Sequence, residues 1–342
     1  MSNYRGKKKL NKYLSGINGL RILKKIVLNP KIPNDIKCNF KTLNAAELKI
    51  LEATLKNNFF KKEAKGYLYT DVGKKDILDH LEGRLEEDRK FSITWLNSVR
   101  KLKGRKVLEI GCGTGASTVA LAEQGAVVTA VDIDHDALTV AKKRCEIYRL
   151  KVDFLNLNVK EIKNKLFKNK YDFVIFWACL EHMTNSERMI AMKETWEMLP
   201  IGGLWCVTDT PNRLYFYDSH TSQLPFFHWL PDDLAIKYAN FSPREKFKNA
   251  FRDFKPNRDD MINFFRWGRG VSFHEFEMTM KPLSKLNIIS CRSIFHRRQG
   301  ILFFLKSITS SSFRYESFLK KRFPKIHSGF FQPYLNLIIK KD

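Results

Sequence analysis

Three glycines at alternate positions stand between a short apolar run and a segment with a helical pattern. Residues 106–115 are Lys-Val-Leu-Glu-Ile-Gly-Cys-Gly-Thr-Gly, and the helical pattern extends from 116 to about 124. Glycine lacks a Cβ and adopts positive φ without strain, so a ligand can lie directly against such a backbone. Free N–H groups at the start of the following helix point toward whatever fills the turn. This arrangement is typical of a nucleotide-type cofactor site in a doubly wound sheet.

An aspartate follows the next predicted strand, a β-branched run at 126–131. Asp132 stands about 20 residues past the glycines, where a carboxylate can bind both hydroxyls of a ribose. The alternative role for Asp132 is a helix N-cap, which Asp134 or Asp136 fits better. Ile133 is expected either against the face of an adenine or in the core. Asp132 is therefore the first candidate partner of the glycine turn.

The elements that must position these residues alternate between strand and helix. Alternation of this kind predicts an α/β fold with a parallel sheet and right-handed crossovers. The remaining strands are expected at 152–157, 171–177, 204–208, 286–291 and 334–340. Helices are expected at 45–55, over 75–102 as one or two helices, at 137–148, at 186–199 and from a capping box at 272–275. The charge block 86–90 indicates either a solvated helix face or a break.

The order of these motifs resembles the class I S-adenosylmethionine-dependent methyltransferases. It runs Glu109-x-Gly111-x-Gly113-x-Gly115, then Asp132, then Leu180-Glu181-His182 and Gly202-Gly203, and is similar to the branch whose fourth strand ends in Leu-Glu-His. The resemblance covers 105–210 and implies a Rossmann-like, mostly parallel, seven-stranded sheet with an antiparallel last strand, and S-adenosyl-L-methionine as cofactor. The cofactor-binding residues that it implies are Glu109, Gly111, Cys112, Gly113, Gly115, Asp132, Ile133, Asn158, Val159, Trp177 and Cys179.

Two of these residues have roles that the resemblance makes specific. Glu109 is expected to order the glycine loop through hydrogen bonds and to favour the sulfonium cation, or else to be a plain strand end. Asn158 stands where the family usually has an aspartate that contacts the adenine amino group. Its amide oxygen can still accept that hydrogen bond, and the alternative is ordinary turn chemistry. Trp177 and Cys179 are expected to line the cofactor cleft or to pack in the core.

A rival interpretation is a nicotinamide dehydrogenase, because residues 111–116 also satisfy the loose G-x-G-x-x-G/A pattern. The additional Gly115, the preceding Glu109 and the Leu-Glu-His sequence favour methyl transfer instead. A nucleic-acid methyltransferase is disfavoured, since no Pro-Pro-Tyr/Phe type tetrapeptide follows the fourth strand. A non-catalytic binding protein is disfavoured because the cofactor positions are intact.

Histidines and an aspartate are the candidates for assisting the reaction. Methyl transfer from a sulfonium is an in-line displacement, and a hydroxyl acceptor benefits from a general base. We predict His182, His220 and Asp209 as catalytic residues, with a structural hydrogen bond as the alternative for His182. The segment 208–231 mixes ionisable groups with aromatics and prolines, as an acceptor pocket requires. Its candidate substrate-binding residues are Asn212, Arg213 and His228, and the alternative is a structural lid.

The chain has three predicted parts besides its cofactor half, 105–210. Residues 1–74 form a basic N-terminal arm with accessory helices, and 75–342 form the methyltransferase domain. That domain carries an acceptor or lid insertion at 211–270 and a basic, Phe-rich insertion at 292–333. The second insertion is expected to be an interfacial amphipathic helix, a helix packed on the sheet, or a dimer contact. The oligomeric state is left open.

Nearly all of the net charge of +25 lies at the two ends of the chain. Residues 1–66 carry +12 and residues 281–342 carry +11, whereas residues 67–280 carry +2. Localised basic surface attracts anionic partners such as membrane headgroups or a phosphorylated glycolipid, and the alternative is solubility alone. Six scattered cysteines without C-x-x-C pairs or a histidine cluster predict no disulfide framework and no metal site. We expect a cytoplasmic protein, peripheral at the inner membrane face.

These patterns together predict a bacterial S-adenosylmethionine-dependent O-methyltransferase. Its expected acceptor is a saccharide or glycolipid of a surface-polysaccharide type pathway. The alternative acceptor is a small metabolite or lipid such as a quinone precursor. The longest apolar run, 173–180, is too short to cross a bilayer.

Overall fold

The computed structural model describes residues 40–342 except 167–169, 253–256, 300–304 and 306–309. Much of the predicted basic arm, and part of the insertion at 292–333, therefore lie outside the described residues. No helix in the described part of the chain is both long and apolar enough to cross a membrane.

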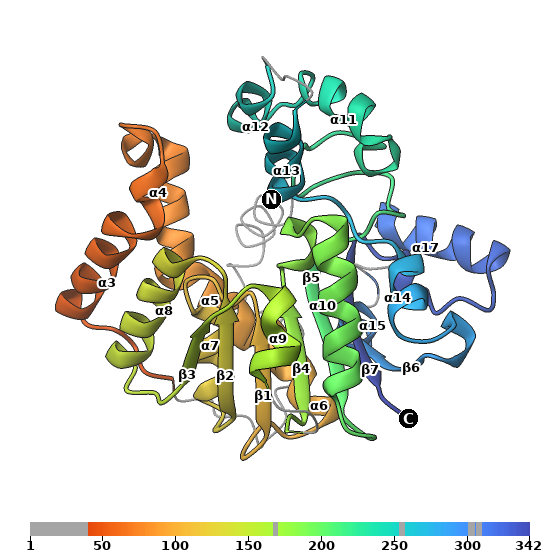
Figure 1. The fold of residues 1–342 in the computed structure, drawn as a ribbon, viewed down its shortest axis with the longest axis horizontal. Helices are drawn as coiled ribbons and strands as arrows, with labels where there is room; N and C mark the ends of the chain where they lie inside the picture. Colours follow the sequence, from red (N-terminus) through yellow and green to blue (C-terminus); the bar gives the residue numbers. More distant parts are fainter. Residues whose placement is uncertain (1–39, 167–169, 253–256, 300–304, 306–309) are drawn as a thin grey trace, which may run out of the picture.

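A seven-stranded sheet occupies the centre of the molecule (Figure 1). Its strand order is β3-β2-β1-β4-β5-β7-β6, and β7 runs antiparallel to both of its neighbours. The strands are β1 (Lys106–Ile110), β2 (Val127–Asp132), β3 (Asp153–Asn156), β4 (Phe173–Trp177), β5 (Leu204–Pro211), β6 (Asn287–Cys291) and β7 (Tyr334–Lys340). The predicted Rossmann-like sheet with an antiparallel last strand is confirmed.

The sheet is buried on both faces because its central strands are apolar on both sides. All five side chains of β4 are buried, as expected for a parallel strand covered by helices on each face. Since β1, β2 and β4 are parallel and in register, Ile110, Asp132 and Trp177 all lie at the carboxyl edge of the sheet. This edge is where ligands bind in doubly wound sheets.

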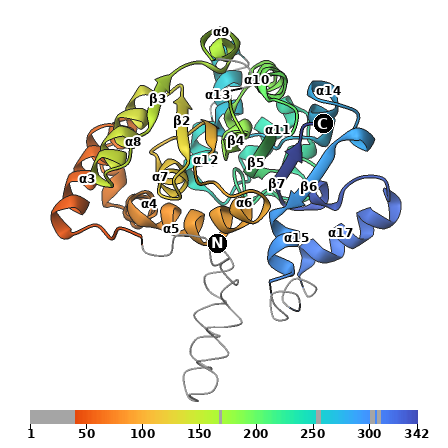
Figure 2. The ribbon, with the colours of Figure 1, turned by 90° about the horizontal axis from the view of Figure 1, so that it is seen from below.

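Helices cover the two faces of the sheet (Figures 1 and 2). One face packs against α6, α7 and α8, with α3 packed outside them on α8, and the other packs against α9, α10 and α14. Their bounds are α3 (Ala45–Asn57), α6 (Thr94–Val99), α7 (Ala116–Ala122), α8 (His135–Ile147), α9 (Ile162–Lys165), α10 (Asn185–Met198) and α14 (Phe273–Thr279). Leu51 and Leu55 of α3 are buried in the core of the first face, so this helix is an integral part of the packing.

The segment before the first strand is one uninterrupted helical run from 71 to 99. It comprises α4 (Asp71–Leu78), α5 (Arg84–Glu87) and α6, joined by π-helical turns at Asp79–Gly83 and Asp88–Ile93. The charge block at 86–90 therefore does not break the helix. Asp88, within that block, is buried, so the block is not a wholly solvated face.

The insertion after β5 folds into helices with an aromatic core of its own. These helices are α11 (Asp232–Ala239), α12 (Glu245–Ala250) and α13 (Arg258–Trp267). Phe227, Phe247 and Phe264 are the centre of that core. The three helices lie beyond the carboxyl edge of the sheet, opposite α4 (Figure 1).

In the second insertion, α15 (Arg292–Arg297) and α17 (Ser311–Arg322) confirm the helical part of the prediction.

A buried histidine connects the helical run to the glycine turn. His80 is 4% exposed, and its Nδ1 lies 3.0 Å from Oγ1 of Thr114. The rings of Phe59 and Phe60 pack against the imidazole. Burial lowers the pKa of His80 to about 2, because the charged ring would lose its hydration, and the nearby Arg84 adds to the effect. The folded protein therefore holds His80 neutral.

We expect His80 to make the protein less stable in mild acid. The unfolded imidazole, with a pKa of 6.5, binds a proton below that pH while the folded one does not, so the free energy of unfolding decreases as the pH falls. Between pH 7.5 and pH 5.5 the loss due to His80 is about 1.4 kcal/mol, measured by urea unfolding. His80→Gln should remove this loss, whereas His135→Gln, at an exposed position, should retain it. Equal losses in wild type and His80→Gln would contradict the prediction.

Candidate active site

The three glycines of the turn have positive φ but different surroundings. A Cβ on Gly111 would lie 2.3 Å from Cβ of Cys179, and one on Gly115 would lie 2.9 Å from Cα of Ala141. These two positions need glycine for close packing of the turn on the neighbouring elements. Gly113, with φ of +51°, has no atom of the described residues within 4 Å of its Cβ position. The turn is therefore packed at both ends and open in the middle.

Glu109 is fully buried beneath the turn. Its carboxylate accepts hydrogen bonds from the hydroxyls of Ser117 (2.5 Å) and Thr118 (2.7 Å), both in the first turn of α7. Burial raises the pKa of Glu109 to about 7, although the two hydroxyl donors oppose the shift. This geometry supports the predicted role in ordering the loop. Because both oxygens already accept hydrogen bonds within the protein, a direct contact with the cofactor stays a prediction.

Asp132 lies beside the open middle of the turn. Its carboxylate accepts hydrogen bonds from the backbone N–H groups of Gly113 (2.7 Å) and Asp134 (2.9 Å). Asp134, and not Asp132, caps α8 by accepting from the N–H groups of its first turn. The side chain of Ile133 is 58% exposed next to Asp132. A carboxylate and an exposed apolar side chain thus flank the glycine turn.

The remaining predicted cofactor residues differ in how far they can reach a ligand. The thiol of Cys179 donates to the carbonyl of Ile110 (3.0 Å), and Cys112 and Trp177 are also buried. The side chain of Asn158 accepts from the N–H of Lys160 and caps a short helical turn that begins at Val159. The turn chemistry considered for Asn158 is therefore present. Contacts with the cofactor stay predictions for Cys112, Asn158, Val159, Trp177 and Cys179.

Arg144 of α8 joins the turn to the helical run 71–99. It is fully buried, and its guanidinium donates to the carbonyls of Thr114 (2.8 Å), Leu81 (3.0 Å) and His80. Burial lowers the pKa of Arg144 to about 10. Sequence reasoning missed this residue, because an arginine within a helix carries no signal of the distant carbonyls it will meet.

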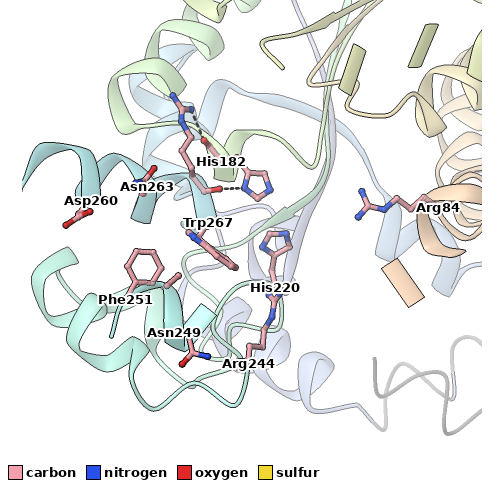
Figure 3. Close-up of a pocket in the computed structure, with 11 residues that line it drawn as sticks. Arg84, His182, His220, Arg244, Asn249, Phe251, Asp260, Asn263 and Trp267 are labelled. Atoms are coloured by element: carbon pink, nitrogen blue, oxygen red, sulfur yellow. Dashed lines mark hydrogen bonds between the residues drawn. The ribbon is translucent and has the colours of Figure 1, made fainter. Parts of the chain in front are cut away.

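A cavity of about 610 Å³ opens beside the carboxyl edge of the sheet (Figure 3). His182, which follows β4, and His220, which follows β5, lie on one side of it. The insertion helices contribute polar residues such as Arg244 and Arg266 together with the rings of Phe251 and Trp267. Arg84 faces these residues from the helical run on the opposite side (Figure 3). The cavity is therefore rich in cationic and hydrogen-bonding groups.

The two predicted catalytic histidines come together at the cavity. Their ring centroids are 5.4 Å apart, and both Nε2 atoms lie within 4 Å of Oε1 of Glu181. Nδ1 of His182 is 2.8 Å from the carbonyl oxygen of Arg266, which is the structural hydrogen bond considered for this residue. Enclosure by the protein and the neighbouring His182 lower the pKa of His220 to about 3. At neutral pH the His220 imidazole is therefore uncharged.

Asp209, the third predicted catalytic residue, is not among the residues that line the cavity. It adopts a positive φ of 55°, and its carboxylate forms a bidentate ion pair with Arg292 of α15. The hydroxyl of Thr208 donates to it as well (2.9 Å). A carboxylate held in this way orients the start of the second insertion. Its predicted catalytic role has no support from the lining of the cavity.

The predicted substrate-binding residues are parts of the framework around the insertion. The amide of Asn212 donates to the carbonyls of Phe330 and Gln332, and Asn212 is 2% exposed. Nδ1 of His228, equally buried, accepts from the N–H of Gly270. Neither these two residues nor Arg213 line the cavity of about 610 Å³, although Asn212 and His228 line a smaller pocket that shares His220 with it. Structural hydrogen bonds therefore hold Asn212, whereas His228 makes one through Nδ1 while its Nε2 lies 3.2 Å from Oδ1 of Asp218.

Asp218 fixes the loop that presents His220, and sequence reasoning gave it no role. Its buried carboxylate accepts from the backbone N–H groups of His220, Thr221 and Ser222. These hydrogen bonds and the adjacent His228 hold the pKa of Asp218 well below its usual value. An aspartate followed by small polar residues is a local signal for such a turn.

Comparison with known proteins agrees with this geometry. Residues 107–203 match a family model described as a methyltransferase domain. The chain is 26% identical over 155 residues to the ubiquinone biosynthesis O-methyltransferase of Pasteurella multocida, covering 37% of this chain and 64% of the relative. It is 34% identical over 89 residues to the enzyme of that name from Coxiella burnetii (strain Dugway 5J108-111), covering 26% and 37%. The chain thus spans between about a third and two thirds of the length of these relatives.

Among solved structures, the chain is similar to magnesium protoporphyrin IX methyltransferase from Synechocystis PCC 6803 with bound S-adenosylmethionine. The identity is 20% and the TM-score is 0.35, over 53% of this chain and 83% of that protein.

Proposed function

We propose that the protein is a class I S-adenosylmethionine-dependent methyltransferase that methylates a hydroxyl oxygen of a small-molecule acceptor, because residues 107–203 match a family model described as a methyltransferase domain. The observation that carries the proposal is the open middle of the glycine turn within the matched region. There a ligand can lie against the backbone at Gly113, with the carboxylate of Asp132 beside it.

The residues present fit the chemistry of the cofactor. Asp132 offers carboxylate lone pairs to ribose hydroxyls, and exposed Ile133 offers an apolar surface to the adenine. Glu109 beneath the turn places a carboxyl group near the site of the cationic cofactor. Gly111, Gly113 and Gly115 keep the turn free of side chains. These residues would hold S-adenosylmethionine, which supplies an electrophilic methyl group on a sulfonium.

The acceptor is proposed to bind in the cavity lined by His182 and His220. Similarity to ubiquinone biosynthesis O-methyltransferases favours a small metabolite, such as a quinone precursor, over the saccharide or glycolipid expected from the sequence. Arg84, Arg244 and Arg266 suit an acceptor that carries an anionic group beside its hydroxyl. The basic ends of the chain are proposed to keep the protein near anionic membrane surface.

The chain's own groups would align the acceptor and assist loss of its proton. In the displacement, the acceptor oxygen forms the new O–C bond while the S–C bond breaks and its electron pair stays on sulfur. The hydroxyl proton must leave the oxygen. Both histidines line the cavity, and their Nε2 atoms lie too far from Glu181 for a hydrogen bond, so either imidazole can accept the hydroxyl proton at Nε2. Arg244 would hold the anionic group of the acceptor.

We expect Arg244→Ala to weaken acceptor binding without changing cofactor binding. Loss of a charge-assisted hydrogen bond of about 1.5–3 kcal/mol raises KM for an anionic acceptor about tenfold or more. Calorimetry gives the cofactor Kd, and transfer of labelled methyl to phenolic carboxylates, phosphorylated sugars and lipid extracts identifies the acceptor. Arg252→Ala, an exposed arginine of the same insertion outside the cavity, is the matched control. Absence of S-adenosylmethionine binding in the wild type would overturn the proposed function.

A further inference from the structure

We propose that Glu181, His182 and His220 form a binding site for one divalent transition-metal ion at the side of the cavity. One ligand atom from each residue, all within 4.8 Å of one another, converges there. The sequence predicted no metal site, because these residues belong to two separate segments. The fold brings the segment after β4 and the segment after β5 to the same edge of the sheet.

The first support for the site is an unpartnered carboxylate oxygen. Glu181 is fully buried, and its Oε2 accepts a hydrogen bond from Oγ1 of Thr210 (3.2 Å). Its Oε1 has no hydrogen-bond partner among the residues that the structure describes. It faces Nε2 of His182 at 3.9 Å and Nε2 of His220 at 3.8 Å. A buried carboxylate oxygen without a partner is destabilising, because it has lost its hydration and gained no hydrogen bond or cation in exchange.

The second support is that both imidazoles present a lone pair at Nε2. Nδ1 of His182 lies 2.8 Å from the carbonyl oxygen of Arg266, so Nδ1 carries the proton. Nδ1 of His220 lies 3.1 Å from Oγ1 of Thr221, whose own proton is directed to the carbonyl of Gly268 (3.0 Å). Nδ1 of His220 is therefore also the protonated nitrogen. Metal-binding histidines are held in the same way, with the other ring N–H donated to an oxygen.

Three electron-pair donors thus meet with no hydrogen bond among them. Distances of 3.8–3.9 Å are too long for hydrogen bonds but suit atoms that share a cation. Two imidazoles and one carboxylate are a ligand set for Zn²⁺, Mn²⁺, Co²⁺ or Fe²⁺, whereas Mg²⁺ and Ca²⁺ prefer oxygen ligands. Three protein ligands converge among the residues that the structure describes, which leaves further coordination positions on the side of the cavity.

A cation in this place changes how the acceptor hydroxyl is activated, a consequence that rests on the proposed function. A hydroxyl oxygen that reaches the cation loses its proton to solvent at a lower pH. The oxygen then takes the methyl group by the displacement described above. Because Nε2 of each histidine would bind the metal, neither histidine would accept the proton.

Metal binding to the untagged full chain tests the site directly. After treatment with a chelator, we expect one Mn²⁺ per chain in an electron paramagnetic resonance titration of the free ion, and one Zn²⁺ per chain by calorimetry. His220→Ala should weaken Mn²⁺ binding at least tenfold. His274→Ala, an exposed histidine outside the cluster, should leave it unchanged. Thermal unfolding monitored by circular dichroism establishes that each variant is folded.

A substitution behind the ligands gives a second measurement. Thr221→Val keeps all three ligands but removes the oxygen that accepts from Nδ1 of His220. Metal affinity should then fall about 10–100-fold, as for other partners of metal-binding histidines. Absence of stoichiometric binding in the wild type, or equal binding by wild type and His220→Ala, would overturn the metal site. Cofactor binding measured in the chelated protein tests the proposed function separately, because Gly113 and Asp132 lie outside the cluster.

Discussion

Gly113→Ala should abolish binding of S-adenosylmethionine while the protein remains folded. The Cβ of alanine would project into the open middle of the turn, where no atom of the described residues lies within 4 Å. A ligand that lies against this backbone would meet the methyl group and lose the close approach that glycine allows. We expect the cofactor Kd measured by calorimetry to rise at least a hundredfold, which corresponds to about 2.7 kcal/mol.

The chain offers a matched control for the backbone strain of this substitution. Gly104 has φ of +74°, and its Cβ position is likewise free of described atoms within 4 Å. It precedes β1 and therefore lies at the opposite end of the strand from the turn. Alanine in a left-handed conformation costs about 1–2 kcal/mol at either position. Gly104→Ala should reduce the free energy of unfolding by about as much as Gly113→Ala does, and it should leave the cofactor Kd unchanged. If Gly113→Ala also left the cofactor Kd unchanged, the assignment of the turn as the cofactor site would be refuted.

Arg188→Met should lower the free energy of unfolding more than Gly104→Ala does. Arg188 of α10 is 1% exposed, and its guanidinium donates to the carbonyls of Leu180 (2.9 Å) and Arg269 (3.1 Å). It also forms an ion pair with Glu275 at 3.1 Å. Methionine would leave these buried oxygens unpaired and Glu275 without its counter-charge. The expected loss is about 3–5 kcal/mol in the free energy of unfolding, measured with urea.

Arg266→Met provides the comparison, because Arg266 of α13 pairs with Glu187, the neighbour of Arg188 in α10, but is 38% exposed. Water replaces the lost contacts of an exposed pair, so its loss should be about 0–1 kcal/mol. Similar losses in the two variants would contradict the role of Arg188. Arg188 holds the segment that carries Glu181 and His182. The Arg188→Met protein should therefore also bind less Mn²⁺.

The patterns that predicted the fold were local. β4 was predicted from an apolar run long enough to be buried on both faces, and all of its side chains are buried. Ser272 and Glu275 form the expected capping box at the start of α14. The insertion at 211–270 had no clear periodicity, yet its described residues form the helices α11, α12 and α13. Short helices that bury aromatic residues such as Phe247 against one another give no long amphipathic repeat, which is why the sequence pattern was weak.

The sequence by itself determined the sheet, the glycine turn and the position of Asp132. Each depends on residues close together along the chain, where periodicity and backbone freedom act. Only the tertiary structure decided what the ionisable side chains do. In the tertiary structure Asp209 forms an ion pair with Arg292, and Asn212 and His228 are buried against backbone groups. Residues that follow two different strands form the cluster of Glu181, His182 and His220. Side-chain charge and hydrogen bonding depend on partners that are distant in sequence, and the fold alone brings those partners within reach.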